Sequence, residues 1–177
     1  MPFRGVILLA FASVAFAQRL PDSVSRPGEV SALNAFVGKW KTAGEMFETK
    51  YSHAQKLSSV MTCEWAPNHQ FLISDQILHS PDGVKDQLGI YGYDPQSKQY
   101  YSYAFFGTGG PPYISHPEIT GNVWTYNGGF KGVTGMVKTR TTNTFVDENT
   151  VIFETQYSED GTHWVTMLKG KDIRIKS

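Results

Sequence analysis

Aromatic side chains at alternate positions are the residues of this sequence best suited to bind another molecule. The chain contains 11 Phe, 9 Tyr and 4 Trp, and many of them fall in two stretches that read as neighbouring strands. One alternating set consists of Tyr91, Tyr93, Tyr101, Tyr103 and Phe105. A second set, on the opposite faces, consists of Leu88, Ile90, Tyr100, Ala104 and Phe106. Successive side chains of a strand point to opposite faces, so we expect one set to face inward and the other outward.

An inward-facing aromatic set has two interpretations. It is either plain core, or the wall of a pocket in which tyrosine hydroxyls orient a small apolar or aromatic molecule. We take the first set, from Tyr91 to Phe105, as candidate ligand-binding residues. The alternation by itself does not decide which of the two sets faces inward.

A second candidate group is polar and lies near the C-terminus. If Val146 pairs with Thr150 across a turn, the period of two places Arg140 on the same face as Glu154, diagonally across the hairpin. Inside a barrel the two residues would bind the charged end of a ligand, and outside they would form a solvated ion pair of little energy. The opposite face of this hairpin is more apolar, which favours the outside placement. We keep Arg140 and Glu154 as candidate ligand-binding residues.

The function class stays open among three alternatives. A binding domain for a small apolar or aromatic molecule is the leading one. An enzyme, an isomerase or hydrolase, could use the same cavity with Asp75, Glu154, Arg140 or a tyrosine as acid or base. The third is a packed structural domain without a cavity. The sequence contains no Gly-x-Ser-x-Gly elbow, phosphate-binding glycine loop or His-Glu-x-x-His helix that would name a reaction.

Metals, cofactors and nucleic acids are not expected partners. The five histidines are spread over separate strands and turns with no close pair, and the spacing therefore supports no metal site. The 16 basic and 16 acidic residues are balanced and form no clustered basic face, which disfavours nucleic acid. The single cysteine, Cys63, sits in an apolar alternation, and we expect a buried, inert thiol. Nothing in the sequence predicts an oligomeric state.

The elements that position these residues are predicted to be almost all strands. Val30, Leu33 and Val37 have the spacing of a short helix over 29–37, which Gly38 ends. Beyond it the hydrophobic period is two, with turn residues about every ten positions. This pattern predicts ten strands at about 39–49, 55–65, 69–79, 84–94, 98–106, 112–119, 122–127, 132–145, 150–158 and 162–175. Short connections without crossover helices favour an antiparallel up-and-down β-barrel, with a two-sheet sandwich as the alternative.

The N-terminus has the layout of a signal peptide. An apolar stretch of about a dozen residues ends at Ala17, shorter than the roughly 20 residues that a membrane helix needs. We therefore expect cleavage after Ala17, export to the periplasm or the medium, and no membrane insertion. Residues 1–17 are the predicted signal peptide, 18–28 a flexible lead-in and 29–177 one domain. Within it, the loop Gly107–Pro112 is either a long hairpin connection or a mobile lid.

Several short motifs together resemble a known family. They are Gly38-Lys39-Trp40, Cys63-Glu64-Trp65-Ala66-Pro67, Leu88 to Asp94 with Tyr100, Tyr157 to Trp164, and a late Arg174. Over residues 31–176 the chain resembles small, often exported bacterial proteins of unknown function. That family is a lipocalin-like barrel, in the same broad group as nitrobindin and the fatty-acid-binding proteins.

The resemblance has two implications for particular residues. It implies that Arg174 packs on the indole of Trp40 and closes one end of the barrel. A nitrobindin-like site would need a histidine near the C-terminal strands to bind haem iron, and His163 is the only candidate there. Its place beside the Asp160-Gly161 turn indicates a residue at the rim, so we expect no haem.

Overall fold

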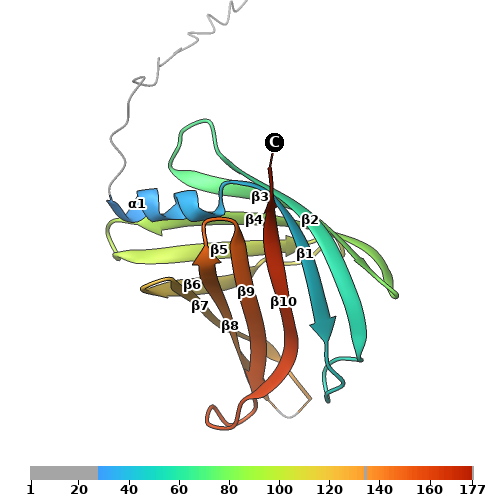
Figure 1. The fold of residues 1–177 in the computed structure, drawn as a ribbon. Coiled ribbons are helices and arrows are strands. Elements are labelled where there is room, and N and C mark those ends of the chain that lie inside the picture. Colours follow the sequence, from blue (N-terminus) through green and yellow to red (C-terminus); the bar gives the residue numbers. More distant parts are fainter. Residues whose placement is uncertain (1–27, 134, 177) are drawn as a thin grey trace, which may run out of the picture.

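The protein is a closed β-barrel of ten antiparallel strands (Figure 1). The structure, a computed structural model, describes residues 28–133 and 135–176. Each strand pairs with the next along the chain, and the first pairs with the last to close the barrel. The strands are β1 Gly38–Met46, β2 Gln55–Trp65, β3 Phe71–Ser80, β4 Gly83–Asp94, β5 Gln99–Phe106, β6 Tyr113–Thr120, β7 Val123–Lys131, β8 Met136–Asp147, β9 Thr150–Ser158 and β10 Val165–Ile175. The predicted up-and-down barrel is thus confirmed; the predicted signal peptide and most of the lead-in lie outside the described residues.

The strand boundaries agree with the predicted ones to within three residues, except around the hairpin of β7 and β8, where they differ by four. β7 runs on through two glycines to Lys131, which moves the turn toward the C-terminus. At Gly129 the strands approach so closely that a Cβ would lie 2.6 Å from the carbonyl oxygen of Val137. The glycines therefore belong to the strand, which continues beyond its predicted end at residue 127.

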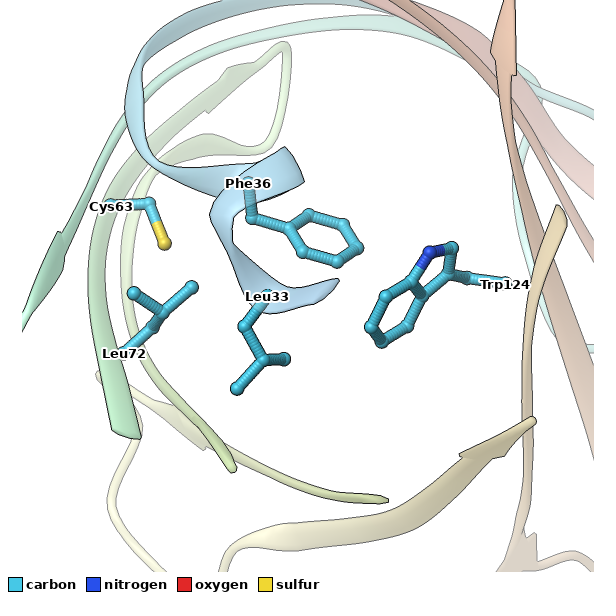
Figure 2. Packing of buried hydrophobic residues seen from close by; sticks show 5 residues of the cluster. All are labelled: Leu33, Phe36, Cys63, Leu72 and Trp124. Carbon is cyan, nitrogen blue, oxygen red and sulfur yellow. The ribbon is translucent and has the colours of Figure 1, made fainter. Parts of the chain in front are cut away.

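A short helical segment lies across one end of the barrel (Figure 1). α1, Gly28–Ala32, continues directly into the 3-10 helix η1, Leu33–Phe36. Leu33 and Phe36 lie among the strands and pack with Cys63, Leu72 and Trp124 in one buried cluster (Figure 2). This end is therefore closed by a hydrophobic plug.

Trp40 and Arg174 hold that plug to the barrel wall, as the resemblance implies. The two residues are direct partners in the β1–β10 register, and the guanidinium carbon lies 4.1 Å from the centre of the indole ring. The indole Nε1 donates a hydrogen bond of 2.8 Å to the carbonyl oxygen of Phe36. Arg174 itself donates to the carbonyl oxygens of Ala35, Val37 and Glu148. The expected contact is confirmed, and it also fixes η1.

The longer connections gather at the opposite end of the barrel. They are the segments 47–54, 107–112 and 159–164, and the short turn at 81–82 lies at the same end. Tyr51 in the first of these packs edge-on against Phe130 and Tyr157, with ring centres 5.2 and 5.0 Å away. β5 and β6 pair over only three positions, Ser102 to Ala104 with Ser115 to Tyr113. This is the shortest pairing in the barrel, and residues 99–101 of β5 and 116–120 of β6, toward the plugged end, lie beyond it.

The only cysteine lies inside the barrel. Cys63 has no exposed surface, and burial raises the pKa of its thiol to about 12. A thiol with such a pKa stays protonated and unreactive at neutral pH. The predicted burial of the thiol is confirmed, and its low reactivity stays a prediction.

Candidate functional site: the barrel cavity

The barrel encloses a cavity of about 440 Å³. It extends from Phe36 of the plug to Met46 and Phe106, at the far ends of their strands. Phe106 lines the cavity and is also 51% exposed, so the cavity reaches the surface at the end that carries the long loops. Its wall also includes Trp40, Thr42, Gln76, Tyr91, Ser102, Ala104, Tyr126, Thr141, Phe153, Thr155 and Asp172.

Aromatic rings form the floor of the cavity. The ring of Phe36 is parallel to that of Tyr91 at 6.0 Å and meets Trp124 and Phe145 edge-on at 4.8 and 5.1 Å. Figure 2 shows the ring of Phe36 projecting from the helical segment toward Trp124 on the barrel wall. Burial raises the pKa values of Tyr91 and Tyr126, so both hydroxyls are neutral at physiological pH. They can serve there as hydrogen-bonding groups for a bound molecule.

A chain of hydrogen bonds crosses four strands of the cavity wall and ends at a carboxylate. Gln76 Nε2 donates to Ser59 Oγ at 2.7 Å, Ser59 Oγ to Thr42 Oγ1 at 2.8 Å, and Thr42 Oγ1 to Asp172 Oδ1 at 2.6 Å. Every donor points toward Asp172. Burial nevertheless raises the pKa of this carboxyl, and the hydrogen bond from Thr42 offsets only part of that effect.

Two further polar pairs lie on other strands of the barrel, between β6 and β9. Thr141 and Thr155 share a hydrogen bond of 2.9 Å between neighbouring strands. Tyr113 of β6 and Thr139 of β8 share one of 2.5 Å across the intervening strand β7. The cavity therefore combines apolar rings with a few fixed polar groups, the composition that is typical of small-molecule sites.

The structure separates the five aromatic candidates into two groups. Tyr91 lines the cavity, and Tyr93 points to the same side but packs against Tyr100, 5.0 Å between ring centres, at the plugged end. The prediction that Tyr101, Tyr103 and Phe105 share their face is wrong, because these three lie on the outer surface.

The register of β4 and β5 explains this correction. Tyr91 is opposite Ser102 and Tyr93 is opposite Tyr100, so odd-numbered residues of β4 share a face with even-numbered residues of β5. The cavity is accordingly lined by Ser102, Ala104 and Phe106, two of which belong to the second aromatic set.

Arg140 and Glu154 share a face, as predicted, and that face is the outer one. Arg140 stacks on Trp164, 4.3 Å from the ring centre, and donates to Gln156 Oε1 at 2.7 Å. Glu154 accepts a hydrogen bond of 2.5 Å from Thr166 and lies 3.4 Å from Lys169 Nζ. These hydrogen bonds and the charge of Lys169 lower the pKa of Glu154. Neither residue lines the cavity, so neither can bind a ligand inside it.

Two other candidates from the sequence also lie outside the cavity. Asp75 is exposed on the outer face of β3 and cannot act as acid or base in the interior. The ring of His163 is 89% exposed, with Nδ1 2.6 Å from Asp160 Oδ2, and this contact raises the pKa of the histidine. Within residues 28–133 and 135–176, no three His, Cys, Asp or Glu side chains are arranged to hold a metal ion.

Sequence reasoning missed the carboxylate of the interior, Asp172. The sequence does contain an indication that Asp172 faces the interior. Asp172 stands two residues before Arg174, and the resemblance implies that Arg174 packs on Trp40. The period of two then puts both side chains on the inner face of β10.

An outer hollow of about 900 Å³ lies beside α1, but its character is different. It is an open surface between α1 and the strands β5 and β6, bordered by the charged side chains of Glu29, Lys98 and Glu118. An open, charged surface gives a small apolar molecule little shelter from water. The interior cavity is therefore the candidate site.

The comparisons place the chain in a family and identify its fold. The chain matches the family described as "Protein of unknown function (DUF1579)" over residues 28–174, and it belongs to that family. No curated protein matches its sequence. None of the helices in the described part of the chain is long and apolar enough to cross a membrane.

Solved structures with the same fold share little sequence with it. The S-type phycobiliprotein lyase CPES from Guillardia theta is 8% identical, with a TM-score of 0.60 over 86% of this chain and 95% of the lyase. Rv2717c from M. tuberculosis is 12% identical, with a TM-score of 0.58 over 85% of this chain and 99% of its own. At these identities the similarity shows the barrel fold alone.

Proposed function

We propose that this protein binds a small apolar or aromatic molecule in the barrel cavity. The observation that carries the proposal is the cavity itself, since a volume of about 440 Å³ lies within the range of about 300–1,000 Å³ typical of ligand sites. A structural domain without ligand would be expected to fill this space with side chains, as protein interiors are close-packed. The cavity reaches the surface beside Phe106, which gives a ligand a way in.

A fluorescence titration with N-phenyl-1-naphthylamine tests this proposal. This uncharged aromatic probe brightens in apolar surroundings, and we expect saturable binding with a dissociation constant of about 1 µM, or about 8 kcal/mol. Ala104→Trp, which places an indole in the cavity, should abolish the signal, while the outer-surface control Phe105→Trp should retain it. Equal binding by both variants would mean that the probe sits on the outer aromatic surface, and the proposal would fail.

A second candidate function is acid–base catalysis, an isomerase or hydrolase activity in the same cavity. The observation that favours it is Asp172, a carboxyl with a raised pKa beside the neutral hydroxyl of Tyr91. The test is turnover of a panel of aryl esters and β,γ-unsaturated ketones. Activity that Asp172→Asn removes and Asp75→Asn retains would support catalysis; a panel without turnover leaves binding as the function.

We further propose that the protein is exported and acts outside the cytoplasm, on the strength of the N-terminal segment. Expressed in a Gram-negative host, the protein recovered from the periplasm or medium should begin at Gln18 by intact-mass measurement. Leu9→Arg, which breaks the apolar stretch, should leave uncleaved protein inside the cell. An uncleaved wild-type protein in the cytoplasm would refute export.

A further inference from the structure

Charge inside the cavity is confined to one side chain. Among the described residues that line it, Asp172 supplies the only carboxyl group, and no lysine, arginine or histidine is present. None of the ion pairs in the described part of the chain includes Asp172. Arg174, two residues further along β10, is engaged by Trp40 and by three backbone carbonyls at the plugged end.

The carboxylate is also incompletely hydrogen-bonded. Its Oδ1 accepts from Thr42, while Oδ2 receives no hydrogen bond from any described residue. Oδ2 is not fully buried, and Asp172 lines the cavity, so a molecule in the cavity can reach this oxygen. A half-buried carboxylate without a cation is costly, and a ligand that brings a positive charge would remove that cost.

The surroundings of Asp172 suit the rest of such a ligand. Tyr91 lies close enough for the charge of Asp172 to raise the pKa of its hydroxyl, and its ring, with Phe36, Trp40 and Tyr126, lines the same cavity. Aromatic faces attract cations, and their apolar area accommodates a hydrocarbon body. A neutral alcohol would use these walls without the charge pairing, and a carboxylate ligand would be repelled.

We propose that the molecule bound in the cavity is an aromatic or aliphatic amine whose protonated nitrogen pairs with Asp172. The proposal rests on the proposed binding function and names its substrate class. It assigns Asp172 as the residue that determines specificity, through a charge-assisted hydrogen bond that neither a neutral nor an anionic ligand can form.

Three probes that share one ring system test the proposal by calorimetry at pH 7. They are 2-(1-naphthyl)ethylamine, 2-(1-naphthyl)ethanol and 1-naphthylacetate. We expect wild-type protein to bind the amine at least about tenfold more tightly than the alcohol, and the acetate most weakly, since tenfold corresponds to about 1.4 kcal/mol. In Asp172→Asn, the affinities for the amine and for the alcohol should differ by no more than about twofold. Asp75→Asn, the same substitution at an exposed carboxylate, should keep the wild-type ratio.

The outcomes separate this proposal from the binding function beneath it. Equal affinity of wild-type protein for amine and alcohol would overturn the amine preference and leave the binding function intact. Failure of all three naphthyl probes and of N-phenyl-1-naphthylamine to bind would overturn both. The wild-type series needs no variant, so it decides the question even if Asp172→Asn does not fold.

Discussion

Removing the Arg174 side chain should be among the most destabilising single changes in this barrel. Its guanidinium donates to the carbonyl oxygens of Ala35, Val37 and Glu148 and covers the face of Trp40. Hydrogen bonds from charged donors are worth up to about 3 kcal/mol, but we take about 1 kcal/mol each because the Arg174 side chain is partly exposed. The stacking on the indole contributes about 1 kcal/mol more. Arg174→Ala should therefore lower the free energy of unfolding by about 4 kcal/mol.

The magnitude matters because small domains are stable by only about 5–15 kcal/mol. Arg174→Lys keeps the charge but loses the planar fork that serves three acceptors, and we expect it to cost about 2 kcal/mol. Arg140→Ala is the matched control, since Arg140 also stacks on a tryptophan, Trp164, but bonds only Gln156 and lies on the outer face. Its cost should stay at about 1 kcal/mol or less.

Urea denaturation followed by tryptophan fluorescence and circular dichroism measures all three variants. From most to least stable, the expected order is wild type, Arg140→Ala, Arg174→Lys and Arg174→Ala. The slope of the unfolding free energy against urea concentration should be the same for all four proteins. If Arg174→Ala and Arg140→Ala are equally stable, the plug does not depend on Arg174 and the reasoning is refuted.

Three further predictions concern Asp172, Cys63 and Gly129. The pKa of Asp172 is higher in the folded protein than in the unfolded chain, so folding favours the protonated carboxyl. The contribution of Asp172 to the free energy of unfolding is therefore complete below about pH 4 and declines as the pH rises through the folded-state pKa. Asp172→Asn should thus gain stability relative to wild type between about pH 4 and 7, where Tyr91 and Arg174 do not titrate; a constant difference in melting temperature would contradict this. Cys63 should resist a thiol reagent such as 5,5′-dithiobis(2-nitrobenzoic acid) for hours in the native protein and react fully in denaturant, and rapid native labelling would show that the barrel opens there. Gly129→Ala should cost about 1–3 kcal/mol in urea denaturation, because its Cβ would press on a backbone carbonyl of the facing strand; an unchanged midpoint would mean that the strands can separate at no cost.

The architecture was predictable because its signals are local. Alternation with period two and regular turn residues define strands without knowledge of their partners, and ten sequential strands with short connections close most simply as a barrel. The contact between Trp40 and Arg174 was predictable from the Gly-x-Trp motif and the arginine near the C-terminus. The shared face of Arg140 and Glu154 was predictable from the register of a single hairpin. A bulge between Phe145 and Asp147, which the sequence does not reveal, leaves the register of these two residues unchanged.

The composition of the cavity wall was not predictable, because it depends on the register of one hairpin. Asp94 pairs with Gln99, which leaves four residues in the turn and sets odd positions of β4 against even positions of β5. Lys98 closes this turn in the left-handed conformation, with φ of 55°. Glycine or asparagine at that position would have indicated the turn geometry, whereas lysine gives no such signal. For this reason the sequence alone does not show that Tyr101, Tyr103 and Phe105 face outward while Tyr91 faces the cavity.

The most direct test of ligand binding is a crystal structure of the protein grown with N-phenyl-1-naphthylamine. We expect density for the probe inside the barrel, in contact with Tyr91, Ala104 and Phe153. Probe density only on the outer surface near Tyr101 and Tyr103, or an interior filled by rearranged side chains, would contradict it.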